Sequence, residues 1–152
     1  MSDKSPLKIL QQYASQFRLI AFLISTFSVI FLGFMLFIGE QRMVDPQMFS
    51  VFYLGIVIGA VQVPLSFYIW KYIPQRLPPK LTEHMLVTGF RMTMVIAFLL
   101  CLGVVLFAGL AAVISGYSYP SAILGGIALG SMLFHWPGNK RFIDFLDSLQ
   151  LR

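Results

Sequence analysis

Charged residues and cysteines are scarce in this 152-residue chain, and both shortages restrict the classes of protein to which it can belong. Asp, Glu, Lys and Arg make up 11% of the residues, whereas a soluble domain carries about 25%. The single cysteine, Cys101, excludes an internal disulfide framework. With 58% hydrophobic residues, the chain is also too apolar for a disordered tail. A bilayer best accommodates so much apolar surface, so we expect a multi-span membrane protein.

Acidic residues are missing from the apolar runs, and this restricts the possible chemistry. A proton-coupled transporter needs a carboxylate near the membrane centre. The six acidic residues instead fall in predicted loops or interfaces: Asp3, Glu40, Asp45, Glu83, Asp144 and Asp147. The chain also lacks a glycine-rich phosphate loop, a Gly-x-Ser-x-Gly elbow and a His-Glu-x-x-His helix. We therefore predict no catalytic residue, no metal site and no nucleic-acid binding.

Four apolar runs approach the length that a helix needs to cross a membrane. About 30 Å of hydrocarbon requires roughly 20 mostly apolar residues. The runs cover residues 19–38, 49–70, 92–115 and 118–136. The last is the weakest, because it is rich in glycine and alanine. The sequence predicts one all-α domain over residues 1–152, an integral membrane bundle of four transmembrane helices.

Basic residues are distributed unevenly around these runs. With a cytoplasmic N-terminus, ten of the eleven basic residues lie on the inner side and only Arg42 lies outside. The positive-inside rule favours this N-in/C-in arrangement, and a bacterial cytoplasmic (inner) membrane is the expected location. The inner set is Lys4, Lys8, Arg18, Lys71, Arg76, Lys80, Arg91, Lys140, Arg141 and Arg152.

Short amphipathic helices are predicted at both termini, over residues 6–18 and 139–150. Each segregates apolar from polar residues, as helices at a membrane surface do. They either anchor the ends of the bundle or dock a partner subunit. At the inner ends of the spans, four residues are expected to contact lipid headgroups: Trp70, Lys71, Arg91 and Trp136.

Small residues form stripes on two of the predicted spans. Helices in lipid associate by close packing, which small residues permit. We therefore predict that these stripes are helix-packing faces, either within the bundle or against a partner chain. They consist of Gly55 and Gly59 on the second span and of Ala122, Gly126 and Gly130 on the fourth.

Three polar residues are candidate site residues. Gln62, two residues before Pro64, is predicted to bond to the carbonyl that the proline frees or to a facing helix; a permeation site is the alternative. His84 and His135 both lie near the inner surface. Two such histidines on neighbouring helices could ligate a haem or another pigment. We expect ordinary interfacial histidines and no cofactor.

The second span has one loose resemblance to a known family. Its small residues, followed by Pro64 and an aromatic run ending in Trp70-Lys71, resemble the second helix of the small four-span assembly proteins encoded beside bacterial ATP synthases. The glycine–proline spacing differs, and no acidic residue matches the third helix of that family. The resemblance therefore implies no site residue here.

Three function hypotheses follow. The first is a non-catalytic accessory, structural or assembly subunit of a larger membrane complex, bound to lipids and to other subunits or to itself through the glycine faces. The second is a small oligomeric channel or transporter with Gln62 on its path. The third is a lipid-modifying enzyme that uses the inner-face charges around His84 and Arg91.

Overall fold

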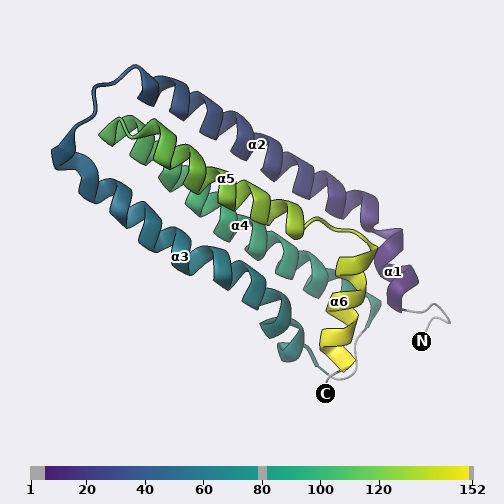
Figure 1. Cartoon of the computed structure of the whole chain (residues 1–152). Coiled ribbons are helices and arrows are strands. Elements are labelled where there is room, and N and C mark those ends of the chain that lie inside the picture. The colour runs from purple at the N-terminus through teal and green to yellow at the C-terminus, as the bar shows by residue number, and fades with distance from the viewer. Residues whose placement is uncertain (1–5, 79–81, 151–152) are drawn as a thin grey trace.

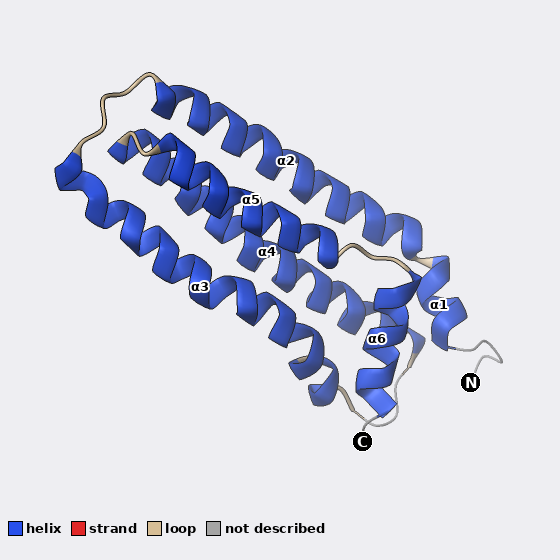
Figure 2. Cartoon of the chain, viewed as in Figure 1, coloured by secondary structure: helices blue, strands red, loops and turns tan. Residues whose placement is uncertain are grey.

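Helices account for all regular structure in the part of the chain that is described, residues 6–78 and 82–150 of a computed structural model (Figure 2). The all-α prediction is confirmed. In chain order the elements are α1 (Pro6–Gln12), α2 (Ala14–Glu40), the 3-10 turn η1 (Pro46–Met48), α3 (Phe49–Tyr72), the 3-10 turn η2 (Pro74–Arg76), α4 (Glu83–Ser115), α5 (Ser118–Phe134) and α6 (Asn139–Gln150).

α4 is the central helix of the fold. It packs against α2, α3 and α5, whereas α2 and α3 hardly touch each other. α5 lies over α4, between α2 and α3 (Figure 1). Small buried residues on α4, such as Ala97, Ala108 and Ala112, let the neighbouring helices come close.

Three helices, α2, α3 and α4, are long and apolar enough to cross a membrane. The predicted runs 19–38 and 92–115 both lie within longer helices. α5 is apolar but has only 17 residues. At 1.5 Å per residue it spans about 26 Å, slightly less than the hydrocarbon thickness.

A turn at Tyr13 separates the first two helices. The predicted terminal helix over 6–18 therefore ends early, at Gln12, and the following residues belong to α2. The Tyr13 N–H donates to the carbonyl of Leu10 over 3.2 Å. This change of direction allows both Leu10 and Phe17 to be buried against the bundle.

Both terminal helices lie at one end of the bundle, which we call the terminal end (Figure 1). Phe142 and Phe145 of α6 are buried, with ring centroids 5.0 Å and 5.3 Å from that of Phe90 on α4. Phe17 approaches Phe90 from α2, at 4.8 Å. The apolar face of α6 is therefore occupied by the bundle itself, which favours the anchoring role over a free docking surface.

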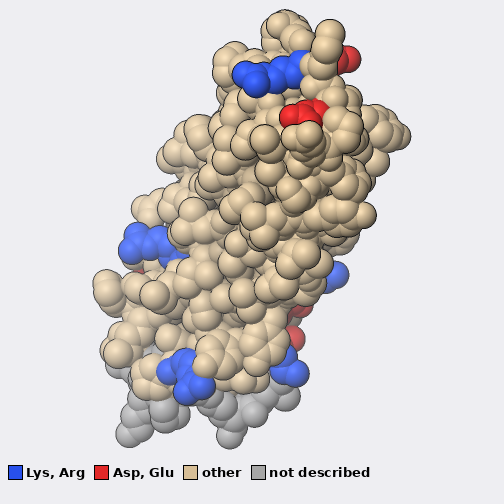
Figure 3. All heavy atoms as spheres, turned by 90° about the vertical axis from the view of Figure 1, so that its left-hand side faces the viewer, with Lys and Arg blue, Asp and Glu red and all other residues tan. Residues whose placement is uncertain are grey.

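On the face shown in Figure 3, charged atoms lie near the top and across the lower half, and a band without charged atoms separates the two groups. Arg42 lies in the loop between α2 and α3, at the end opposite the terminal one. Lys4, Lys80 and Arg152 lie outside the described residues. The described basic residues near the terminal end are Lys8, Arg18, Lys71, Arg76, Arg91, Lys140 and Arg141.

Candidate functional site

A pocket of about 370 Å³ opens at the terminal end, between the α1–α2 junction and the first turns of α4. We call it the terminal pocket. It brings together His84 and Arg91, which the sequence had singled out, with Tyr13 and Gln16, which it had not. The turn at Tyr13 has no local sequence signal, so this wall of the pocket could not be foreseen. The complete lining is Tyr13, Gln16, Phe17, Glu83, His84, Val87, Thr88 and Arg91.

The start of α4 places the polar side of this pocket. The Thr82 hydroxyl accepts the Met85 N–H over 3.3 Å and so caps the helix. Glu83 and His84 consequently occupy its first turn. Arg91 is exposed, and no ion pair joins it to another described residue.

A second polar cluster joins α3 to the end of α5. His135 is fully buried, and its Nε2 lies 2.9 Å from the Ser66 hydroxyl oxygen. That hydroxyl has one proton and donates it to the Val63 carbonyl over 2.6 Å. The histidine must therefore donate its Nε2–H to Ser66. Its Nδ1 keeps a lone pair that has no hydrogen-bond partner in the described part of the chain.

Trp70 is buried in this cluster, which corrects the expectation that it contacts lipid headgroups. Only 5% of it is exposed. Its ring is stacked with His135 at a centroid distance of 6.1 Å and packs edge-on against Phe90 at 5.4 Å. The Arg141 guanidinium lies 5.4 Å from the Trp70 ring centre. α6, which carries Arg141, therefore lies beside Trp70, although hydropathy alone predicts Trp70 at the surface.

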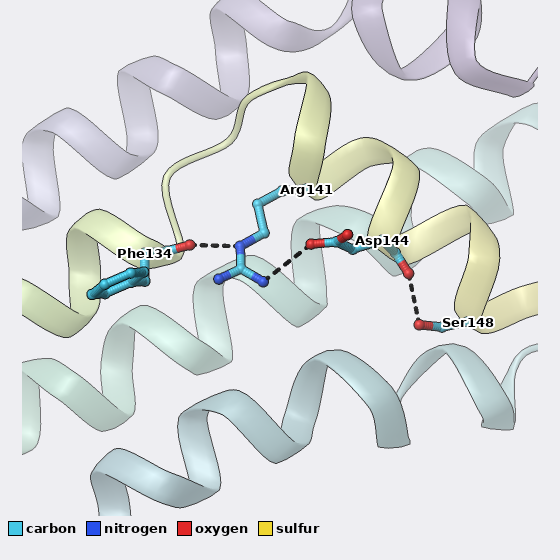
Figure 4. Close-up of polar contacts among 4 residues, drawn as sticks. All are labelled: Phe134, Arg141, Asp144 and Ser148. Atoms are coloured by element: carbon cyan, nitrogen blue, oxygen red, sulfur yellow. Dashed lines mark hydrogen bonds and ion pairs between the residues drawn. The ribbon is translucent and has the colours of Figure 1, made fainter.

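Arg141 connects α6 to the end of α5 (Figure 4). Its Nε–H donates to the Phe134 carbonyl, one of the carbonyls that the end of α5 leaves free. Its Nη1 lies 3.4 Å from an Asp144 carboxylate oxygen, and the Asp144 carbonyl accepts from Ser148 over 2.7 Å. Burial lowers the pKa of Arg141, and Asp144 opposes that shift. Together these contacts fix the angle between α5 and α6.

The two histidines do not share a site. His84 is exposed and lines the terminal pocket with residues of α1 and α2, whereas His135 packs against α3. In this arrangement they do not form a pair of axial ligands. Across the described residues, no group of three or more His, Cys, Asp and Glu side chains could hold a metal ion.

The glycine stripes face in two different directions. Gly55 and Gly59 are buried, and a Cβ at Gly59 would meet Leu124 of α5 at 2.8 Å. A Cβ at Gly126 or Gly130 would meet nothing within 4 Å, so these two face outward. The buried glycine of α5 is instead Gly125, which lies against Leu32 of α2.

Gln62 lies against the central helix. A Cβ at Gly103 of α4 would stand 2.8 Å from the Gln62 Oε1, so the glycine leaves room for this amide. The Oε1 is buried and accepts no hydrogen bond from the described residues. A bond to the carbonyl freed by Pro64 would instead be donated by the amide nitrogen of Gln62. Gln62 lies against a facing helix, and the predicted hydrogen bond to that helix stays a prediction.

The other predicted interface residues remain at the surface to different degrees. Lys71 and Arg91 are exposed, whereas Trp136 is half-buried and packs against the core. Ala122, the remaining member of the α5 stripe, lines a shallow depression together with Gly33 of α2. The depression between α2 and α5 thus has a small residue on each side, next to the larger Leu36, Phe37 and Tyr119.

Removing the Ser66 hydroxyl should destabilise the fold. In Ser66→Ala, the buried Nε2–H of His135 loses its acceptor, which costs about 1–3 kcal/mol of unfolding free energy. Thermal unfolding in detergent micelles measures this loss. Ser50→Ala, at an exposed position of the same helix, is the control and should change stability by less than about 0.5 kcal/mol. Equal effects would contradict a stabilising Ser66–His135 bond.

No family model, curated protein or solved structure matches this chain. A functional proposal for it therefore draws on its own residues and geometry.

Proposed function

We propose that this chain is a non-catalytic accessory or assembly subunit of a larger complex in a bacterial inner membrane. In this proposal it crosses the membrane four times, with α5 as the fourth span and both termini in the cytoplasm. The basic residues near the terminal end support that orientation. α6 follows α5 and contacts α1, so the chain returns to the end where it began.

The outward-facing small residues carry the proposal of a subunit. Gly126 and Gly130 leave one face of α5 open, and Gly33 does the same on α2. All three lie within apolar helices, so an apolar transmembrane helix of another protein is the partner whose backbone could approach there. The bundle interior favours the same role, because α4 fills its centre with packed side chains and carries no charged residue between 92 and 115.

The native mass of the tagged chain tests the proposal. The protein is extracted from its own membrane in mild detergent. The native mass and the protein composition of the extracted particle are then determined. A large particle that contains unlike membrane proteins is the expected result. A small particle that contains only this chain would overturn the subunit role, and it would favour the oligomeric channel or transporter instead.

Filling the open face should release the partner without unfolding the chain. Gly126→Leu places a large side chain where the monomer has free space, so the thermal midpoint should change little. The partner helix can no longer approach, and the large particle should be lost. Val57→Leu, at a position of α3 that is 58% exposed, is the control and should keep the partner. Unchanged native mass in Gly126→Leu would contradict docking at this face.

A further inference from the structure

One guanidinium, one imidazole and three further hydrogen-bond donors converge on the terminal pocket. His84, Thr88 and Arg91 are spaced i, i+4 and i+7 and therefore share one face of α4. Tyr13 and Gln16 face them across the pocket from the start of α2. Each of these five side chains carries an N–H or O–H group, and an arginine guanidinium binds phosphate through two parallel hydrogen bonds.

The rest of the lining is apolar except for one carboxylate. Val87 provides carbon surface beside the donors, and Glu83 stands at the helix start. Phe17 is almost completely buried, so it belongs to the floor of the pocket. A ligand for this pocket therefore combines an anionic group with an apolar part. The headgroup end of a phospholipid has both.

The length of α4 places the pocket at headgroup depth. Its 33 residues extend for about 50 Å, well beyond the hydrocarbon thickness of roughly 30 Å. The uncharged stretch begins at Met92, directly after Arg91. Arg91 therefore stands at the border of the apolar stretch, where lipid phosphates lie. This step relies on the membrane orientation proposed above, but not on the subunit role.

We propose that the terminal pocket binds the phosphate headgroup of an anionic phospholipid. Arg91 and His84 bind the phosphate oxygens, Thr88 and Gln16 donate further hydrogen bonds, and Val87 packs against the start of the acyl chains. A lipid phosphate suits the site better than a free anion, because the pocket joins its donors to apolar surface at the membrane border.

Lipid binding to the whole protein in neutral detergent tests this proposal. Phosphatidylglycerol and phosphatidylcholine are titrated separately, and bound lipid is counted by native mass spectrometry. We expect a clear preference for phosphatidylglycerol. Arg91→Gln should weaken that binding about tenfold, as expected for loss of a hydrogen bond to a charged group. His84→Gln should weaken it less, because a neutral donor remains.

Arg42→Gln is the matched control. Arg42 is an exposed arginine at the opposite end of the bundle that does not line the pocket, so phosphatidylglycerol binding should change less than about twofold. Equal weakening by Arg42→Gln and Arg91→Gln, or equal binding of both lipids, would overturn the proposal. Displacement of the lipid by millimolar inorganic phosphate would assign the pocket to a free anion and would overturn it as well. Binding is measured on the isolated chain, so loss of a partner complex does not affect this result.

Discussion

Phe90→Ala should destabilise the protein by about 3–5 kcal/mol, as large core truncations do. The Phe90 ring is fully buried and is the centre of the aromatic cluster at the terminal end. It contacts Phe17 of α2, Trp70 of α3 and both buried phenylalanines of α6. Its removal leaves a cavity shared by four helices. The expected result is a much lower unfolding midpoint, together with an α6 that is less firmly held.

Limited proteolysis adds a local measurement to the unfolding midpoint. Trypsin cleaves after Lys140 and Arg141, at the start of α6. In Phe90→Ala this cleavage should be faster than in the unmodified protein at a temperature where both are folded. Phe22→Ala, at a position that is 57% exposed on α2, is the control, and both its midpoint and its cleavage rate should stay unchanged. Equal behaviour of the two variants would show that the cluster does not hold the terminal helices.

Gly39→Ala should destabilise the protein by about 1–3 kcal/mol, although it adds only one methyl group. That methyl would stand 2.6 Å from the Ala112 carbonyl oxygen and 2.8 Å from the carbonyl carbon. These are backbone atoms of the central helix, so they cannot rotate away. α2 would have to move outward from α4 at the end opposite the terminal one.

Gly33→Ala on the same helix is expected to change the free energy of unfolding in the opposite direction. An added methyl group at Gly33 meets nothing within 4 Å. Alanine is favoured over glycine inside a helix by roughly 0.5–1 kcal/mol, so stability should stay equal or rise slightly. Unfolding of both variants in the same detergent checks the pair. A loss of similar size in both would show that the contact with Ala112 does not determine the effect.

Composition and periodicity predicted the helical class, and the helix predicted over 139–150 coincides with α6. They could not show which span is central. Residues 19–38 and 92–115 are both long and uncharged. Because lipid and a packed interior are equally apolar, hydropathy does not distinguish a lipid-facing helix from a central one. The feature that distinguishes α4 from the other helices is the number of small residues on its buried face, such as Ala97, Ala108 and Ala112.

The polar contacts were harder to foresee than the helices. Ser66 and His135 are 69 residues apart, and no local pattern indicates that they meet. The direction of the α5 glycines was equally hidden, since Gly125 faces the bundle and its neighbour Gly126 faces outward. A shift of one residue along a helix turns a side chain by about 100°. Such a choice depends on how the neighbouring helices pack, and the spacing of glycines does not contain that information.

The central position of α4 has a consequence for biosynthesis. α2 and α3 leave the ribosome first, yet they hardly touch each other and share α4 as their common neighbour. α2 and α3 therefore lack their main packing partner until α4 has been made. We expect the nascent chain to stay next to the insertion machinery or to a chaperone until residue 115 has emerged. α5 can then complete the bundle, and α6 can cover the aromatic cluster.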